Sequence, residues 1–428
     1  MDKYVNRLKT LLQKGLFHIM GTNILNYLIS FVTNILIVRF LSKTNYGIFS
    51  YAYNQYSLFL LFSGMGLISG VLQFGSEKRP DEEKESYFRF GLTAGLIFNL
   101  LISTFIFLYG RFVNISIPES APYICELMLL PLFDYVFNYI AILLRIRKKN
   151  KEYARLMNIN TILYFLFACS GAYFYGITGT ILGRYFAFSL SIIIGIRFCK
   201  YDFQKMRGVQ KLYSSQKRGI LKYSIIACLS NSISSLLYLI DIALIGLYIK
   251  DSVTVAVYKV ATTIPNAMVF IPSSIMVFIY PYFAEQNQNF DWIKQKYYSM
   301  LKALLLVNAF ISLLLVIFAP YIISILWGQE YLDAVIPFRI LSFSYFISAS
   351  FRIPCGNILA MLRKVKVNLV VSIISGICNI LLDMVLIPYM GPNGAAVATL
   401  SVVAISSVIA FPYLLYYINS NISDSRKV

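Results

Sequence analysis

A small set of charged side chains lies inside long apolar stretches of this chain, and their chemistry needs an explanation. The basic members are Arg39, Arg184, Lys259, Arg339 and Arg352. The acidic members are Asp134, Asp241 and Asp383. Charge at the depth of a bilayer is expensive, so such residues usually face a water-filled interior or a partner. Because a guanidinium can grip phosphate with two hydrogen bonds, the basic members are candidates for binding an anionic substrate.

The three aspartates are candidates for a different task. A carboxylate at membrane depth either pairs with a cation of the chain or binds a coupling ion, for which both H⁺ and Na⁺ are suitable. The basic side chains have a simpler alternative, which is snorkelling of their head groups to lipid phosphate. This alternative applies to all of them except Arg352, which lies deepest and is therefore the strongest candidate for a substrate-binding cation.

The composition indicates that the chain is surrounded by membrane lipid. The 428 residues are 58% hydrophobic and only 13% charged, with a mean hydropathy of +0.68. Soluble domains carry about 25% charged residues, so this chain is typical of a membrane protein. Its net charge of +19 would indicate nucleic acid in a soluble protein. Here the basic residues fall mostly in short loops, which the positive-inside rule explains, so we expect no nucleic-acid partner.

Twelve stretches are long and apolar enough to cross a bilayer, which takes about 20 residues each. They are 17–41, 51–75, 90–110, 122–144, 156–176, 178–198, 222–249, 255–283, 299–319, 334–359, 367–389 and 393–418.

Alternate loops are basic, and this fixes the expected topology. The basic set comprises the N-terminus, 76–89, 145–155, 197–222, 284–298, 360–366 and the C-terminal tail. The other set is short and poor in charge, and comprises 42–50, 111–121, 250–254 and 320–333 together with turns near 176 and 391. The pattern predicts a multi-pass membrane protein with both termini on the cytoplasmic side.

The chain repeats itself. "YGITGTILG" (175–183) matches "MGPNGAAVA" (390–398) at an offset of 215 residues, half of the chain. "RIRKKNK" (145–151) matches "AMLRKVK" (360–366) at the same offset. We therefore predict an all-α fold of two pseudo-symmetric six-helix lobes around a central cavity. The lobes are expected at 1–200 and 222–428, joined by a basic cytoplasmic linker at 201–221.

One position breaks the repeat. Arg184 follows the first glycine motif, and Thr399 stands at the matching position after the second. Each motif is interpreted as a tight turn between two spans, since glycine fits such turns and lets helices approach closely. Packing alone would not require a cation beside the first turn. Arg184 is therefore predicted to face the cavity or its outer rim.

The sequence lacks the motifs that are typical of several enzyme activities. No phosphate-binding loop of the ATPase type and no zinc-protease motif occur, and the six cysteines show no paired spacing. The chain also has one histidine and no long extramembrane segment that would hold a catalytic domain. We expect neither an enzyme, nor catalytic residues, nor a metal site or cofactor, apart from a coupling ion.

Several stretches resemble one family in their order and spacing. They are "IVRFLSKTNYGIFSYA" (37–52), "GLISGVLQFGS" (66–76), "LIDIALIGLYIKDSVTVAVYKVA" (239–261), "FAPYIISILWGQEYLDAVIPFRILSFSYFI" (318–347) and "ILLDMVLIPYMGPNGAAVATLSV" (380–402). The chain resembles the polysaccharide-exporter branch of the multidrug/oligosaccharidyl-lipid/polysaccharide exporter superfamily, the flippases of O-antigen and capsule repeat units. Arg39 is the one charged residue that matches a family motif.

The resemblance implies a substrate and partners. The substrate would be an undecaprenyl-diphosphate-linked oligosaccharide, moved from the inner to the outer leaflet by alternating access. Membrane lipid, a polysaccharide polymerase and glycosyltransferases would be the partners. Three alternatives stay open: an ion-coupled exporter of drugs or metabolites from the same superfamily, a lipid II flippase, and a membrane scaffold for glycan assembly. The sign of the charge in the cavity would discriminate between glycan and drug.

Overall fold

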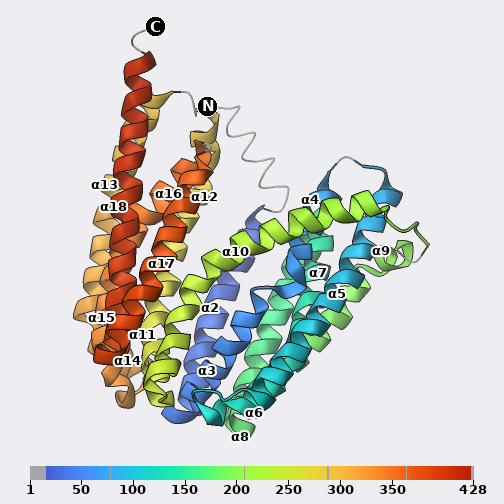
Figure 1. Ribbon diagram of the computed structural model, residues 1–428, viewed down its shortest axis with the longest axis horizontal. Helices are drawn as coiled ribbons and strands as arrows, with labels where there is room; N and C mark the ends of the chain where they lie inside the picture. Colours follow the sequence, from blue (N-terminus) through green and yellow to red (C-terminus); the bar gives the residue numbers. More distant parts are fainter. Residues whose placement is uncertain (1–15, 78, 207, 287–288, 363, 426–428) are drawn as a thin grey trace. The chain divides into compact units, whose positions relative to one another are not determined.

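The computed structural model describes residues 16–77, 79–206, 208–286, 289–362 and 364–425. Within these ranges the chain consists of helices joined by short turns and contains no strand, which confirms the all-α prediction (Figure 1). Segment 1–15, Arg363 and the tail 426–428, which the topology and repeat arguments used, lie outside the described residues.

The chain divides into two compact units, Met1–Leu236 (unit 1) and Leu237–Val428 (unit 2), and each is described by itself. The division falls inside one helix, whereas the sequence placed the linker at 201–221. The limits of the two six-helix lobes stay a prediction.

Unit 1 begins with α2 and continues into the shared helix α10. Its elements are α2 Leu16–Phe40, α3 Lys43–Leu60, η1 Ser63–Gly66, α4 Leu67–Ser76, α5 Asp81–Phe112, η2 Pro118–Ser120, α6 Ala121–Glu126, η3 Leu127–Leu129, α7 Leu130–Ile146, α8 Asn150–Phe198, α9 Lys200–Lys205 and the first part of α10 Ser214–Ile249.

Unit 2 takes the rest of α10 and all that follows. Its further elements are α11 Ser252–Met268, α12 Phe270–Glu285, α13 Phe290–Ile317, α14 Ala319–Trp327, η4 Gln329–Ala334, α15 Val335–Ile347, the π-helical η5 Ser348–Arg352, α16 Ile353–Met361, α17 Val365–Met390 and α18 Pro392–Ser425.

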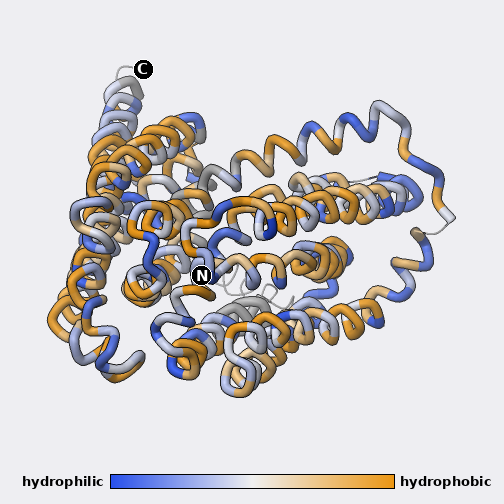
Figure 2. The backbone as a smooth tube through the Cα atoms, turned by 60° about the horizontal axis from the view of Figure 1, so that its bottom comes forward, coloured by the Kyte–Doolittle hydropathy of each residue, from blue (hydrophilic) through white to orange (hydrophobic). Residues whose placement is uncertain are grey.

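Nine helical segments of the described residues are long and apolar enough to cross a membrane, where the sequence predicted twelve spans. Two shorter apolar helices, Leu25–Phe40 and Leu239–Ile249, lie within two of the other predicted spans. The segment α8 has 49 residues, about twice the length that one crossing needs. It reverses at Gly176, where φ is 60° and ψ is −134°, so it supplies two spans. Hydrophobic residues run along the helices and hydrophilic ones gather at the turns (Figure 2).

The predicted duplication is visible in the helix bounds. Helix α3 begins at Lys43 and α11 at Ser252, 209 residues later, and α5 and α13 begin at Asp81 and Phe290 with the same offset. The offset becomes 215 for the later helices, since α8 begins at Asn150 and α17 at Val365. Corresponding helices of the two halves therefore begin at matching positions of the repeat.

The turns at the glycine motifs are also repeated. Gly391 has φ 55° and ψ −131°, almost the values of Gly176. A Cβ on Gly179 would lie 2.1 Å from the carbonyl oxygen of Gly171, and one on Gly394 would lie 2.3 Å from that of Leu386. Both motifs are tight turns between closely packed helices, as the sequence predicted.

Some expected loops are shorter than predicted. Residues 42–50 were expected to form a loop, but α3 starts at Lys43 after the N-cap Ser42, whose hydroxyl accepts from the Asn45 amide. Residues 320–333 form α14 and η4 rather than an irregular loop. At Lys43 the helix can begin in polar sequence because the Ser42 hydroxyl satisfies one of its free backbone N–H groups.

The basic segment after α8 packs against other helices of unit 1. Arg147, in the turn between α7 and α8, binds Glu85 of α5 and donates through Nε to Asp202 of α9 at 2.8 Å. Ser86 donates to the carbonyl of Gln210 at 2.8 Å. The side chains of Cys199, Met206 and Leu212 are buried. This part of the expected linker is thus held to unit 1 by ion pairs and apolar contacts.

Candidate functional site

Five polar side chains meet inside unit 2, and we call them the acid cluster. They come from four helices: Asp241 from α10, Tyr258 from α11, Asn379 and Asp383 from α17, and Thr399 from α18. Asp241 and Asp383 are 7% and 0% exposed. The helices converge because α17 and α18 form the hairpin that turns at Gly391.

Hydrogen bonds join the members of the acid cluster. Oδ2 of Asp241 accepts from the Tyr258 hydroxyl and from the Thr399 hydroxyl, the latter at 2.9 Å. The Asn379 amide donates to Oδ2 of Asp383 at 2.9 Å and more weakly to Oδ1 of Asp241 at 3.4 Å. One amide therefore lies between two carboxylates, which places their negative charges close together.

The carboxylates of the acid cluster are not paired with a cation among the described residues. No ion pair with lysine or arginine reaches Asp241 or Asp383 in the part of the chain that is described. Oδ1 of Asp383 is buried and lacks a hydrogen-bond partner there. A buried, unpaired carboxylate is costly unless it takes up a proton or a cation. Carboxylate, hydroxyl and amide oxygens suit a proton or a hard cation such as Na⁺.

The sequence singled out two members of this cluster and missed three. Asp241 and Asp383 were predicted, and the fold brings them together although 142 positions separate them. Asn379 lies one helical turn before Asp383, which is a signal that sequence reasoning could have used. Thr399 was noticed only as a departure from the repeat, and nothing in the sequence pointed to Tyr258.

The matching region of unit 1 has the opposite charge. With the offsets of 209 and 215, Asp241, Asn379, Asp383 and Thr399 correspond to Val32, Tyr164, Ala168 and Arg184. The Arg184 guanidinium lies 4.6 Å from the Tyr164 ring centroid and 4.0 Å from that of Phe188. Unit 1 thus places a cation between aromatic rings where unit 2 gathers carboxylates.

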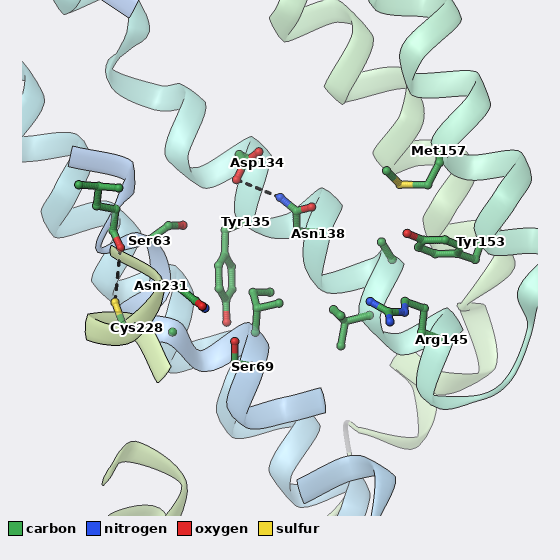
Figure 3. A pocket seen from close by; sticks show the side chains of 15 residues that line it. Ser63, Ser69, Asp134, Tyr135, Asn138, Arg145, Tyr153, Met157, Cys228 and Asn231 are labelled. Atoms are coloured by element: carbon green, nitrogen blue, oxygen red, sulfur yellow. Dashed lines mark hydrogen bonds between the residues drawn. The ribbon is translucent and has the colours of Figure 1, made fainter. Parts of the chain in front are cut away.

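Unit 1 contains a pocket of about 300 Å³ lined by both polar and apolar side chains, called the unit 1 pocket (Figure 3). Asp134 and Asn138 lie on α7, and the Asn138 amide donates to the Asp134 carboxylate at 3.0 Å. Other polar residues lining it are Ser63, Ser69, Tyr135, Arg145, Tyr153 and Asn231. Arg184 does not line the pocket.

One wall of the pocket is a break in a spanning helix. Between α3 and α4, Gly64, Met65 and Gly66 have φ values of 54°, 48° and 73°. Such a break frees backbone groups, which a membrane tolerates only where protein or water satisfies them. The Ser232 hydroxyl of α10 donates to the freed Leu61 carbonyl at 2.7 Å. The irregular backbone is therefore built in and held by α10.

The remaining predicted cations lie apart from these two sites. Arg39 is exposed in the last turn of α2, and Arg339 is exposed on α15, where its Nε donates to the Val316 carbonyl at 3.0 Å. Lys259 on α11 and Arg352 at the end of the π-helix η5 are half-buried. Neither of their side chains has an ion pair or a hydrogen bond to another described residue. Whether any of these cations faces a cavity stays a prediction.

Comparison with known proteins identifies the family. A family model described as polysaccharide biosynthesis protein matches residues 12–287, which is more than half of the chain. The chain belongs to this family. A second model, MatE, matches residues 227–385. No curated protein sequence matches the chain.

Solved structures of transporters share the fold of this family member. Lipid II flippase MurJ in an inward closed conformation has a TM-score of 0.75 at 14% identity, covering 94% of this chain and 87% of MurJ. An inward-facing multidrug resistance MATE family transporter of the MOP superfamily has a TM-score of 0.74 at 12% identity, with 93% and 96% covered. A MOP superfamily transporter from Pyrococcus furiosus has a TM-score of 0.56 at 13% identity, with 95% and 94% covered. The chain is thus a multi-pass membrane protein with the fold of MOP-superfamily transporters and flippases.

Proposed function

We propose that this protein is a flippase that moves an undecaprenyl-diphosphate-linked oligosaccharide from the inner to the outer leaflet of a bacterial cytoplasmic membrane. The transport is coupled to H⁺ or Na⁺, which binds at the acid cluster. Both termini are cytoplasmic, and a polysaccharide polymerase and glycosyltransferases are the partners that use and supply the glycan. Family membership supports the glycan, and the fold shared with MATE and MurJ structures supports transport.

The acid cluster carries the coupling part of the proposal. Two buried carboxylates share the Asn379 amide, and Oδ1 of Asp383 has no partner among the described residues. A proton or Na⁺ would neutralise this charge, so the free energy of the cluster depends on the ion concentration to which it is exposed. The members come from α10, α11, α17 and α18, so ion binding would change how these four helices pack.

The basic side chains support the anionic substrate. Lys259 and Arg352 are half-buried cations without ion pairs to other described residues. A half-buried cation without a counter-charge attracts an anion, and a diphosphate carries the charge that it lacks. Arg352 ends a π-helix, a distortion that frequently marks functional positions. Arg39, Arg184 and Arg339 remain candidates for the same role.

A reconstitution experiment tests the proposal. The purified protein is placed in liposomes that contain a fluorescent undecaprenyl-diphosphate-linked oligosaccharide, and a glycosidase added outside reports how much of it becomes accessible. We expect accessibility to rise only when the liposomes carry an H⁺ or Na⁺ gradient. Asp383→Asn should remove the gradient dependence, and Arg352→Glu should reduce flipping at any gradient. Equal accessibility with and without the protein would refute the flippase.

A second assay tests the alternative function, which is drug export. Cells that express the protein are challenged with cationic drugs, and the wild type is compared with Asp241→Asn. Resistance that is lost in Asp241→Asn, together with no flipping in liposomes, would favour the exporter. Full surface polysaccharide with Arg352→Glu would instead favour a scaffold.

A further inference from the structure

We propose that the unit 1 pocket binds one uncharged sugar residue of the translocated glycan, an inference that rests on the proposed function. The pocket collects hydrogen-bonding groups in an apolar unit. Asp134 and Asn138 lie along α7, Ser63, Ser69 and Asn231 lie on one side of them, and Arg145 and Tyr153 lie on the other (Figure 3).

These groups match the chemistry of sugar hydroxyls. A hydroxyl both donates and accepts, so it needs partners of both kinds. Carboxylate and amide oxygens accept, whereas amide and guanidinium N–H groups donate. Asp134 and Asn138 offer an acceptor and a donor–acceptor one helical turn apart, linked by a 3.0 Å hydrogen bond. The serine hydroxyls can serve in either direction.

The electrostatics favour a neutral ligand. Asp134 and Arg145 both line the pocket, on either side of Asn138 along α7, so the lining carries one acidic and one basic side chain. A diphosphate or an acidic sugar would approach Asp134 with a charge of the same sign, and a cation would approach Arg145 in the same way. An uncharged sugar meets neither repulsion, and its hydroxyls can accept from and donate to the polar side chains of the lining.

The small volume and the rigid wall of the pocket suit a small ligand that is held in one orientation. A volume of about 300 Å³ lies at the lower end of the range for small-molecule sites. Tyr135 is locked in the wall, since its hydroxyl donates to the Gly91 carbonyl at 2.6 Å and its ring packs on Gly64 and Gly95. Rings of Tyr135 and Tyr153 supply apolar surface for the C–H faces of a sugar. A rigid polar pocket rejects ligands that leave its groups unpaired.

The test compares prenyl diphosphates with and without a sugar. Four short-chain probes are titrated into the purified full-length protein: the bare prenyl diphosphate and the same compound carrying N-acetylglucosamine, galactose or glucuronic acid. Variants are Asn138→Ala, Ser69→Ala and Asp134→Asn. Thr93→Val is the control, because Thr93 is an exposed residue of α5 that bonds only within its own helix. Asn138→Ala and Ser69→Ala each remove one polar group, so the test still gives an answer when one of these two variants fails to fold.

We expect at least one neutral sugar probe to bind about tenfold tighter than the bare compound in the wild type. Asn138→Ala and Ser69→Ala should each shrink this advantage by about threefold to tenfold, and Asp134→Asn by about tenfold or more. The affinity of the bare probe and all values for Thr93→Val should not change.

Other outcomes overturn the inference. Equal binding of all four probes, tightest binding of the glucuronic acid probe, or variants that weaken the bare probe equally would each contradict a neutral sugar site. So would a cationic dye that displaces the sugar probes from the wild type but not from Asp134→Asn. Failure of every probe to bind, the bare one included, would instead contradict the proposed function.

Discussion

The Thr399 hydroxyl donates a hydrogen bond to the Asp241 carboxylate across 2.9 Å. In the first copy of the repeat, the same position is Arg184, which stacks on Tyr164 and Phe188. One position therefore solvates a buried carboxylate in unit 2 and supplies a cation in unit 1. The two copies share a backbone plan but differ in charge, and this difference is the reason why we propose unit 2 as the site of the coupling ion.

Asp383→Asn should abolish the dependence of transport on its coupling ion. The change keeps the shape of the side chain but removes one of two buried charges, so little remains for H⁺ or Na⁺ to neutralise. We expect at least a tenfold loss of ion-stimulated flipping in liposomes. Asp291→Asn, which alters an exposed aspartate of α13, is the control. Unchanged ion stimulation in Asp383→Asn would place the coupling site elsewhere.

Thr399→Val should tighten binding of H⁺ at the acid cluster. Valine has the shape of threonine but cannot donate to Asp241, so the charged carboxylate loses a hydrogen bond worth about 1.5–3 kcal/mol and gains more from an incoming proton. The proton concentration that gives half-maximal transport should fall about tenfold or more. Thr399→Ser restores the hydroxyl and should return this concentration close to the wild-type value. A Thr399→Val protein with wild-type ion affinity would show that this hydroxyl plays no part.

Arg184→Ala should destabilise unit 1. The guanidinium loses its contacts with two rings, each worth about 0.5–2 kcal/mol, and Asp134 loses its nearby positive charge. Thermal unfolding in detergent should shift by several degrees, and Arg184→Lys should recover part of the loss. Arg155→Ala, an exposed arginine of α8, should change the midpoint little. Equal midpoints for Arg184→Ala and Arg155→Ala would contradict this role.

The ion pairs of Arg147 should control the reactivity of Cys199. Burial raises the pKa of the Cys199 thiol to about 12, so the thiolate that reacts with maleimide is scarce near neutral pH and grows only as the pH approaches that value. In a variant that keeps Cys199 as its one cysteine, labelling of the native protein should be slow. Arg147→Ala leaves Glu85 buried without its partner and Asp202 with Lys149 alone, 3.5 Å away. Loss of a partner from a buried ion pair costs about 3–5 kcal/mol, so the variant should release the segment and speed labelling.

The control for this experiment is Arg155→Ala in the same single-cysteine background, which should label as slowly as the parent. Fast labelling of Cys199 in the parent protein would mean that the segment after α8 is not held as the ion pairs indicate.

Gly391→Ala should cost stability through the backbone alone. A Cβ on Gly391 meets no atom within 4 Å, yet its φ of 55° with ψ of −131° is a conformation that only glycine adopts readily. We expect a loss of about 1–3 kcal/mol in the free energy of unfolding. Gly219→Ala is a matched control, because its Cβ also has open space and its helical backbone accepts alanine. A Gly391→Ala protein as stable as Gly219→Ala would rule out strain at this turn.

The outline of the fold could be predicted because its signals are local. Apolar stretches longer than a bilayer is thick specify spanning helices, and Gly176 and Gly391 specify turns through a backbone conformation that they alone adopt readily. The loop at 42–50 was predicted wrongly because the helix continues beyond its apolar part once Ser42 caps it. The contact between Asp202 and Arg147 could not be predicted from the local sequence, because a basic segment is equally typical of a solvated linker.

The sequence by itself determined the membrane environment, the helices, the duplication and the family to which the chain is similar. It also named Asp241 and Asp383, because charges in apolar segments are rare and expensive. Only the tertiary structure decided which charges have partners. Arg147 pairs with Glu85 and Asp202, whereas Asp241 and Asp383 share an amide and have no cation among the described residues. Pairing depends on contacts between helices far apart in the chain, and no local pattern records these contacts.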